Sequence, residues 1–144
     1  MNKKAINEKL RFDIAASECA ALGSLLGAEI AQKFGPRDET PLSILSYATD
    51  GALIAGLNAL AHWRWLYIRH LWVREDYRGM GYGGQLIDAA QMIAQERDYA
   101  GLYIDTFEQS IADFYEKKGF TRSGVIKDFP LGGTRIFLSK ALHT

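Results

Sequence analysis

The most informative part of the sequence is LWVREDYRGMGYGGQLI, residues 71–87. It begins at the end of an apolar run and leads into an amphipathic one, and four glycines fall within the six positions from Gly79 to Gly84. Glycine weakens regular structure, so this cluster indicates backbone that bends sharply or approaches another group closely. The N–H groups at the start of the following helix, with Arg78 beside them, would form an anion site. We therefore expect these residues to bind a phosphate or pyrophosphate of a nucleotide-like cofactor.

Length and composition indicate one globular domain. The 144 residues suffice for one buried core but not for two ordinary domains, so we predict a single domain spanning residues 1–144. Hydrophobic residues make up 48% of the chain and charged residues 24%, which argues against disorder. Because 17 basic residues balance 17 acidic ones, no net field recruits nucleic acid or an anionic membrane, and we expect neither as a partner.

Cysteine usage and the start of the chain bear on its location. The single cysteine, Cys19, excludes an internal disulfide framework and a thiolate metal cluster. It lies in an alanine- and leucine-rich segment, where we expect a buried, inert thiol. The first residues are basic but lead into further charges rather than an apolar signal region, and no apolar run is long enough to span a bilayer. We expect a cytoplasmic protein.

The hydrophobic pattern predicts alternating strands and helices. The first half reads as a strand over 9–15, a helix over 18–34 capped by Ser17, strands over 42–48 and 52–60 around a turn at Asp50-Gly51, and a long strand region over 61–73. The second half reads as a helix over 84–97, a strand over 101–106, a helix over 110–118, and strands over 120–127 and 134–140. This order predicts one α/β domain with a mixed sheet whose early part is antiparallel.

A dinucleotide-binding oxidoreductase is one interpretation of the glycine cluster. Gly79, Gly81 and Gly84 satisfy G-x-G-x-x-G, and Asp105 follows about twenty residues later, as that fingerprint requires. However, residues 74–78 separate the glycines from their strand, whereas the fingerprint glycines follow the strand directly. A dinucleotide unit also normally opens its sheet, and here a hairpin comes first. We rank this alternative last.

The second pattern in the cluster is Arg-x-x-Gly-x-Gly, carried by Arg78, Gly81 and Gly83. With the strand before it and the helix after it, residues 71–87 resemble the acyl-CoA pyrophosphate loop of the GNAT N-acetyltransferase superfamily. A second block, FYEKKGF at residues 114–120, is similar to the later helix-to-strand motif of that family. The resemblance covers roughly residues 42–140 and is greatest to small bacterial members.

The resemblance implies a fold and a cosubstrate. The fold would be a single α/β domain whose mixed, mostly antiparallel sheet splays between its fourth and fifth strands and is flanked by helices. The cosubstrate would be acetyl-CoA, with its pantetheine arm along the splayed edge formed by Leu71, Trp72 and Val73. A backbone N–H near Leu71 would polarise the thioester carbonyl. The pyrophosphate would be held by Arg78, Gly79, Met80, Gly81, Tyr82, Gly83 and Gly84.

The resemblance also suggests catalytic residues. Tyr115 stands where many members place the tyrosine that protonates the departing sulfur, although a core aromatic residue is the alternative interpretation. For the general base we name His70. Strand alternation would place Arg69 and His70 on opposite faces of the sheet, and a bulge could swap them. Arg69 stands where a carboxylate is frequent in the family, which casts doubt on a carboxylate base there and would suit an acidic acceptor.

The activity implied is acetyl transfer from acetyl-CoA to a primary amine of a small molecule or a protein, directly within a ternary complex. No residue resembles an acyl-carrying nucleophile, and no His, Cys, Asp or Glu constellation has metal-ligand spacing, so we expect no metal. Asp105 could orient the amine, although a surface carboxylate is the simpler interpretation. A CoA-binding regulatory module without catalysis is the alternative function. Edge strands near the C-terminus make a homodimer plausible.

Overall fold

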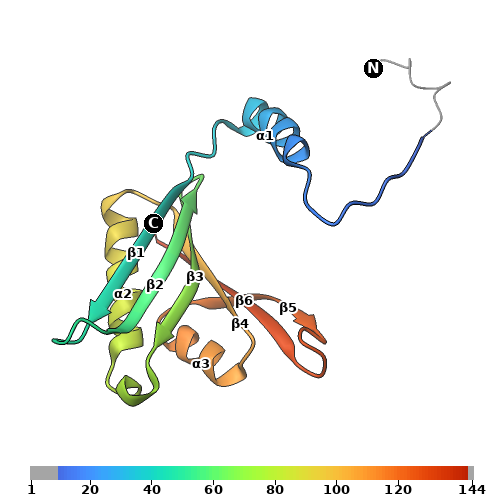
Figure 1. Cartoon of the computed structure of the whole chain (residues 1–144). Coiled ribbons are helices and arrows are strands. Elements are labelled where there is room, and N and C mark those ends of the chain that lie inside the picture. Colours follow the sequence, from blue (N-terminus) through green and yellow to red (C-terminus); the bar gives the residue numbers. More distant parts are fainter. Residues whose placement is uncertain (1–9, 143–144) are drawn as a thin grey trace. The chain divides into compact units, whose positions relative to one another are not determined.

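The computed structural model describes residues 10–142 and divides the chain into two compact units, the first ending at Pro36 and the second beginning at Arg37 (Figure 1). The first unit contains α1, Ala20–Phe34. The helix ends as predicted at Gly35, which has a φ of 86° and donates its N–H to the Ala31 carbonyl at 2.8 Å. A single domain over the whole chain stays a prediction.

Three expectations for the first unit were wrong. Helix α1 begins at Ala20, so Ser17 does not cap it and Cys19 takes the N-cap position without a side-chain hydrogen bond. The Cys19 thiol is exposed rather than buried. Residues 10–15 form no strand, and Lys9 lies outside the described residues. Leu10, Phe12 and Ile14 alternate as strand residues do but are all exposed, because no described strand pairs with this segment.

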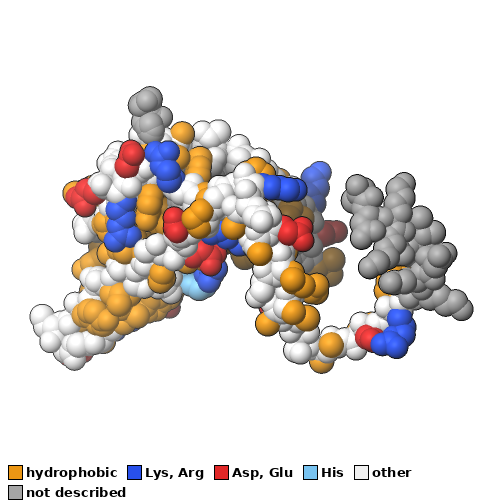
Figure 2. Space-filling view, turned by 90° about the horizontal axis from the view of Figure 1, so that it is seen from above, with side chains coloured by type: hydrophobic (Ala, Val, Ile, Leu, Met, Phe, Trp, Pro, Cys, Tyr) orange, Lys and Arg blue, Asp and Glu red, His pale blue; other side chains and the backbone are white. Residues whose placement is uncertain are grey.

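The apolar side chains of α1 are not covered within its own unit. Leu22, Leu25, Leu26 and Phe34 are all exposed, and no residue of the helix is buried. Figure 2 shows hydrophobic side chains gathered along this segment. The stable core therefore has to come from the second unit.

The second unit is built on a six-stranded mixed sheet in the order β1-β2-β3-β4-β6-β5. Its strands are β1 Thr40–Tyr47, β2 Leu53–His62, β3 Trp65–Val73, β4 Gly101–Thr106, β5 Thr121–Lys127 and β6 Thr134–Ala141. Only β3 and β4 pair in parallel; the other four neighbouring pairs are antiparallel. The predicted mixed, mostly antiparallel sheet is confirmed.

Two tight turns shape the first three strands. The predicted turn at Asp50-Gly51 is confirmed, with Gly51 at a φ of 90° and the Ala48 N–H donating to the Ala52 carbonyl at 2.9 Å. A second turn at Trp63 and Arg64, with φ of 47° and 67°, divides the predicted strand region over 61–73 into the end of β2 and the whole of β3. The sequence did not reveal this turn, because non-glycine residues seldom adopt positive φ.

Two helices cover one face of the sheet. They are α2, Tyr82–Glu96, which packs against β1 to β4, and α3, Gln109–Lys117, which packs against β4, β5 and β6 (Figure 1). Beneath them a row of buried side chains crosses four adjacent strands at Ala59, Ile68, Ile104 and Leu138. We call this the helix face and the opposite side the open face. Within residues 10–142, no helix is long and apolar enough to cross a membrane.

Candidate active site

The centre of the sheet contains a splay. Strands β3 and β4 pair over four residues only, Trp65–Ile68 with Gly101–Ile104. Beyond Ile68, β3 continues to Val73 and β4 to Thr106 without pairing, so the two strands separate. The predicted splay is confirmed. It lies between the third and fourth strands of the described structure rather than the fourth and fifth, since the strand predicted over 9–15 is not formed.

A cavity of about 280 Å³ occupies the splay, and both faces of the sheet contribute to its lining. From the helix face come side chains such as Ile68, Ile104 and Tyr115, while Arg69 and His70 belong to the open face. Leu71, predicted to contact the cosubstrate, also lines it. The gap between the strands therefore joins the two faces at one point, which is what a reaction between molecules bound on opposite faces requires.

A β-bulge sets the positions of Arg69 and His70. In the pairing with β2, Asn58 opposes His70 and Ala59 opposes Ile68, so Arg69 has no partner residue. Ile68 and Leu71 both pack into the core, which leaves Arg69 and His70 together on the open face. The bulge considered in the sequence therefore exists, and it brings two residues to one side that simple alternation would separate.

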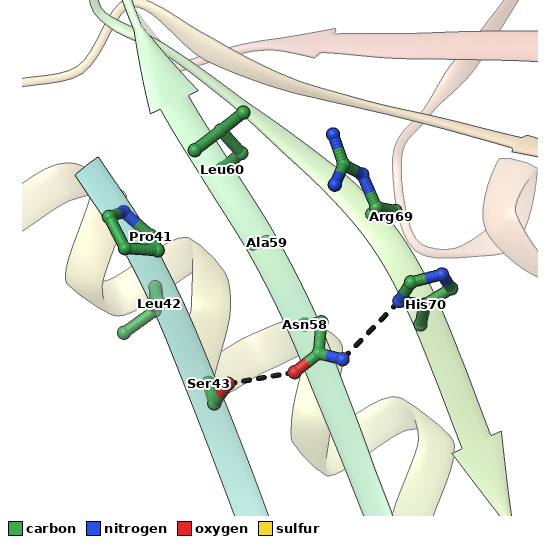
Figure 3. A pocket seen from close by; sticks show the side chains of 8 residues that line it. All are labelled: Pro41, Leu42, Ser43, Asn58, Ala59, Leu60, Arg69 and His70. Carbon is green, nitrogen blue, oxygen red and sulfur yellow. Dashed lines mark hydrogen bonds between the residues drawn. The ribbon is translucent and has the colours of Figure 1, made fainter. Parts of the chain in front are cut away.

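His70 is held by a hydrogen-bonded row across three strands (Figure 3). The Ser43 hydroxyl donates to Asn58 Oδ1 at 2.7 Å, and Asn58 Nδ2 lies 3.3 Å from His70 Nδ1. With the amide placed this way, His70 Nδ1 accepts a hydrogen bond from the Asn58 amide, and the neutral ring carries its hydrogen on Nε2. The sequence did not predict a role for Asn58, because a single asparagine in a strand belongs to no motif and is usually an ordinary polar residue.

A second polar cluster surrounds Asp105 on the open face. The Tyr67 hydroxyl donates to Asp105 Oδ1 at 2.7 Å, and Arg135 Nε donates to Oδ2 at 2.8 Å. The Asp105 side chain is only 10% exposed, so its interpretation as a surface carboxylate was wrong. Burial and the hydrogen bond to Asp105 raise the pKa of Tyr67, and the same carboxylate raises the pKa of Arg135. Both oxygens are thus engaged at the edge of the splay cavity.

Tyr115 reaches the cavity from α3. Its side chain is 5% exposed and packs near Phe114 and Phe120, with ring centroids at 5.6 and 6.0 Å. Burial, with a smaller contribution from the charge of Asp105, raises the pKa of Tyr115 to about 12. The phenol is therefore protonated at neutral pH, and it makes no hydrogen bond within residues 10–142. The ring belongs to the core and the residue also lines the cavity, while its role toward the departing sulfur stays a prediction.

The glycine-rich loop follows directly from the splayed end of β3. Arg74 forms a two-point ion pair with Asp76, at 2.7 and 2.9 Å, beside the short helix η2, Glu75–Tyr77. Arg78 Nε then donates to the Val73 carbonyl at 2.8 Å, which folds this side chain back over the end of the strand. The entrance to the loop is thus fixed by side-chain contacts on both sides of the turn.

The loop presents a row of backbone donors. Gly79 and Gly81 have φ of 77° and 90°, conformations that favour glycine, and Gly81 is the N-cap of α2. Within residues 10–142, none of the N–H groups from Gly79 to Gly84 donates to a backbone carbonyl, whereas that of Gln85 donates to the Gly81 carbonyl at 3.0 Å. A Cβ on Gly83 would meet nothing within 4 Å. This open row of N–H groups can receive an anion.

Comparison with known proteins decides the family. A family model described as the acetyltransferase (GNAT) domain matches residues 42–122. The chain belongs to this family. The match includes the splay, the loop and Tyr115, so the acetyltransferase assignment covers the parts of the structure described above. Members of the family transfer an acetyl group from acetyl-CoA, which is the cosubstrate of this acetyltransferase.

Individual relatives agree with the assignment. Acetyltransferase Atu2258 of Agrobacterium fabrum (strain C58 / ATCC 33970) is 32% identical over 89% of this chain and 94% of its own length. Blasticidin-S acetyltransferase of Streptomyces morookaense is 34% identical over 64% of this chain and 68% of its own. A solved structure of a candidate acetyltransferase from Agrobacterium tumefaciens superposes with a TM-score of 0.83 at 29% identity, covering 92% of this chain and 99% of that one.

These findings exclude the dinucleotide-binding alternative. Its sheet would be parallel and doubly wound, whereas this sheet opens with antiparallel hairpins and contains one parallel pair. Asp105, the residue expected on a ribose, is instead held by Tyr67 and Arg135. Among residues 10–142, no group of three or more His, Cys, Asp or Glu side chains could hold a metal ion.

Proposed function

We propose that this acetyltransferase transfers the acetyl group of acetyl-CoA directly to a primary amine within a ternary complex. The observation that carries the proposal is the splay cavity, lined from both faces of the sheet. The thioester would enter from the end of β3, and the amine would enter from the open face. Because the two substrates would reach the cavity from different sides, both could be bound at once and the acetyl group would pass directly between them without an acyl-enzyme.

The donor would be held by backbone along its length. Its pyrophosphate would accept hydrogen bonds from N–H groups between Gly79 and Gly84, which lie at the positive end of α2. Its pantetheine arm would pair with the unpaired edge of β3 from Leu71 to Val73, like an added strand. Trp72 faces away from the core and is 45% exposed, so its contribution there would be backbone.

The reaction needs a neutral amine and a base to produce it. We assign the base to His70, which lines both the splay cavity and the open face. For Nε2 to accept a proton, the neutral ring must carry its hydrogen on Nδ1. A half-turn of the Asn58 amide allows this, because Oδ1 then accepts from Nδ1 and Nδ2 donates to the Ser43 hydroxyl. Asn58 would therefore select the reactive tautomer.

The remaining steps follow from the bond changes. The amine nitrogen attacks the thioester carbonyl, the C–N bond forms, and the C–S bond breaks to release CoA as a thiolate. The departing sulfur takes up the proton that the attacking nitrogen must still lose, which leaves a neutral amide and CoA as a thiol. Tyr115 would donate a hydrogen bond to this sulfur. Because its pKa of about 12 exceeds that of a thiol, near 8.5, the phenol stabilises the thiolate more readily than it protonates it fully.

The acceptor is a small molecule or a protein amino group. A relative named blasticidin-S acetyltransferase favours a small-molecule amine, and blasticidin S is the first acceptor to try. A cytoplasmic location and a homodimer formed through edge strands near the C-terminus stay predictions.

Two-substrate kinetics would test the proposal. Initial rates with varied acetyl-CoA at several fixed amine concentrations should give intersecting double-reciprocal lines, and mass spectrometry should show one added acetyl group on the amine. Parallel lines would indicate an acyl-enzyme and contradict direct transfer. If Tyr115→Phe left turnover unchanged, the role assigned to Tyr115 would be wrong. Acetyl-CoA binding without transfer to any amine would support the non-catalytic CoA-binding module.

A further inference from the structure

The geometry points to Arg69 as the binding site for a carboxylate of the acceptor, so that the substrate of this enzyme is a small amine that also carries an acid group. This inference rests on the proposed function, since it assigns the acceptor of the same site. It begins from an arginine whose position is set by the bulge and whose charge is not neutralised.

Arg69 differs from most arginines of the second unit. Five of them pair with carboxylates: Arg37, Arg64, Arg74, Arg122 and Arg135. Within residues 10–142 the Arg69 side chain makes no ion pair or hydrogen bond, and its guanidinium lies 6.0 Å from the centre of the Tyr67 ring. Asp105, a carboxylate that lines the same splay cavity, is already bound by Tyr67 and Arg135. Arg69 is therefore a cation that the protein itself leaves available.

The surroundings of Arg69 suit a small anion. A second cavity of about 210 Å³ lies on the open face, lined by Pro41, Leu42, Ser43, Asn58, Ala59, Leu60, Arg69 and His70. Figure 3 shows Arg69 and His70 on the same stretch of β3, beside Leu60 and Asn58. None of these residues is acidic, so the cavity contains nothing that would attract a second cation or repel an anion.

The two cavities share Arg69 and His70. A molecule whose amine reaches the splay beside His70 therefore brings its neighbouring atoms past Arg69. The planar guanidinium presents two parallel N–H donors that match the two oxygens of a carboxylate. A phosphate, with up to two charges, would call for a second cation, and Arg69 is the only Lys or Arg in the lining. A single carboxylate is the group that fits.

Matched acceptors would test the inference. We would measure kcat/KM for β-alanine, 4-aminobutyrate and 6-aminohexanoate, and for the carboxamide of each. The wild type should prefer at least one acid over its amide by tenfold or more, and the series shows which separation of amine and carboxylate fits. Arg69→Gln should lower kcat/KM for that acid by 10- to 100-fold and leave the rate with the amide and the KM for acetyl-CoA unchanged. Arg69→Lys should restore part of the loss.

The control variant is Arg97→Gln, at an exposed arginine after α2, which should change neither rate. Equal rates for each acid and its amide, or an acid preference that survives Arg69→Gln, would overturn the carboxylate site and leave the proposed function standing. If acetyl-CoA raised the melting temperature but no amine, with or without a carboxylate, were acetylated, the proposed function would fail and this inference with it.

Discussion

Gly83→Ala should affect the stability of the fold and the affinity for acetyl-CoA in opposite directions. Gly83 lies in the first turn of α2, its φ is not in the left-handed region, and an added Cβ would meet nothing within 4 Å. The protein thus has no steric reason for glycine here. Alanine is the better helix former by up to about 1 kcal/mol in a helix interior, and we expect about half of that in the first turn. The free energy of unfolding should rise by about 0.5 kcal/mol and the melting temperature by about 2 °C.

The cosubstrate should respond in the opposite direction. A methyl group in this open space would push the pyrophosphate away from the loop N–H groups. Loss of one charge-assisted hydrogen bond costs about 1.5–3 kcal/mol, so the Kd for acetyl-CoA should rise by about 10- to 150-fold. Calorimetric titration with acetyl-CoA and a thermal melt of the apo protein measure the two effects separately.

The matched control is Gly124→Ala in β5, where an added Cβ also meets nothing and no cosubstrate is proposed to bind. It should leave acetyl-CoA affinity unchanged. A Gly83→Ala protein that is at least as stable as the wild type and binds acetyl-CoA within threefold of it would refute the pyrophosphate site at this loop. A destabilised Gly83→Ala protein would refute the structural half of the reasoning.

Three further predictions concern the polar residues of the site. Tyr115→Phe should lower kcat by about 10- to 100-fold with little change in acetyl-CoA affinity. Because the pKa of Tyr115 is raised to about 12, the stability contributed by its neutral form is complete below pH 10 and is lost as the pH rises through 12. Urea unfolding between pH 8 and 11.5 should show the wild type losing about 2 kcal/mol more than Tyr115→Phe. His70→Ala should lower kcat by about 100-fold, and Asn58→Ala by less, in steady-state assays at saturating acetyl-CoA. Asp105→Asn should lower the free energy of unfolding by about 1.5–3 kcal/mol in urea, whereas Asp113→Asn, at an exposed aspartate, should lower it by under about 1 kcal/mol. Equal losses would show that the buried cluster stabilises the fold no more than an exposed ion pair does.

Local signals in the sequence were sufficient for most of the fold. Strand β4 was predicted with its observed bounds, because its run of six residues from Gly101 is too short for a helix and lies between two helical patterns. The turn at Trp63 and Arg64 was not, since its positive φ angles are imposed by the pairing of β2 with β3 rather than by turn residues. The strand predicted over 9–15 failed for the converse reason. An alternating pattern allows a segment to form a strand, but the strand forms only where its backbone can pair with a neighbouring strand.

The residues of the candidate site also differ in whether a local motif could predict them. The glycine loop and Tyr115 lie in contiguous motifs, and the sequence pointed to both. Asn58, Tyr67 and Arg135 were missed because each acquires its role from a residue on another strand: His70 for the first and Asp105 for the other two. Cross-strand partners depend on register, and register depends on where the bulge falls, which no local pattern specifies.

The bulge and the splay are two parts of one arrangement. A parallel pair at the centre of an otherwise antiparallel sheet can end wherever its strands diverge, and here it ends at Ile68, the residue before the bulge. The extra residue, Arg69, lets β3 stay paired with β2 while it leaves β4. The same residue turns two consecutive side chains, Arg69 and His70, toward the open face, where both line the splay cavity. Deletion of Arg69 should restore the regular ladder, with Ile68 still opposite Ala59 and His70 still opposite Asn58, so His70 would stay on the open face and lose the guanidinium beside it.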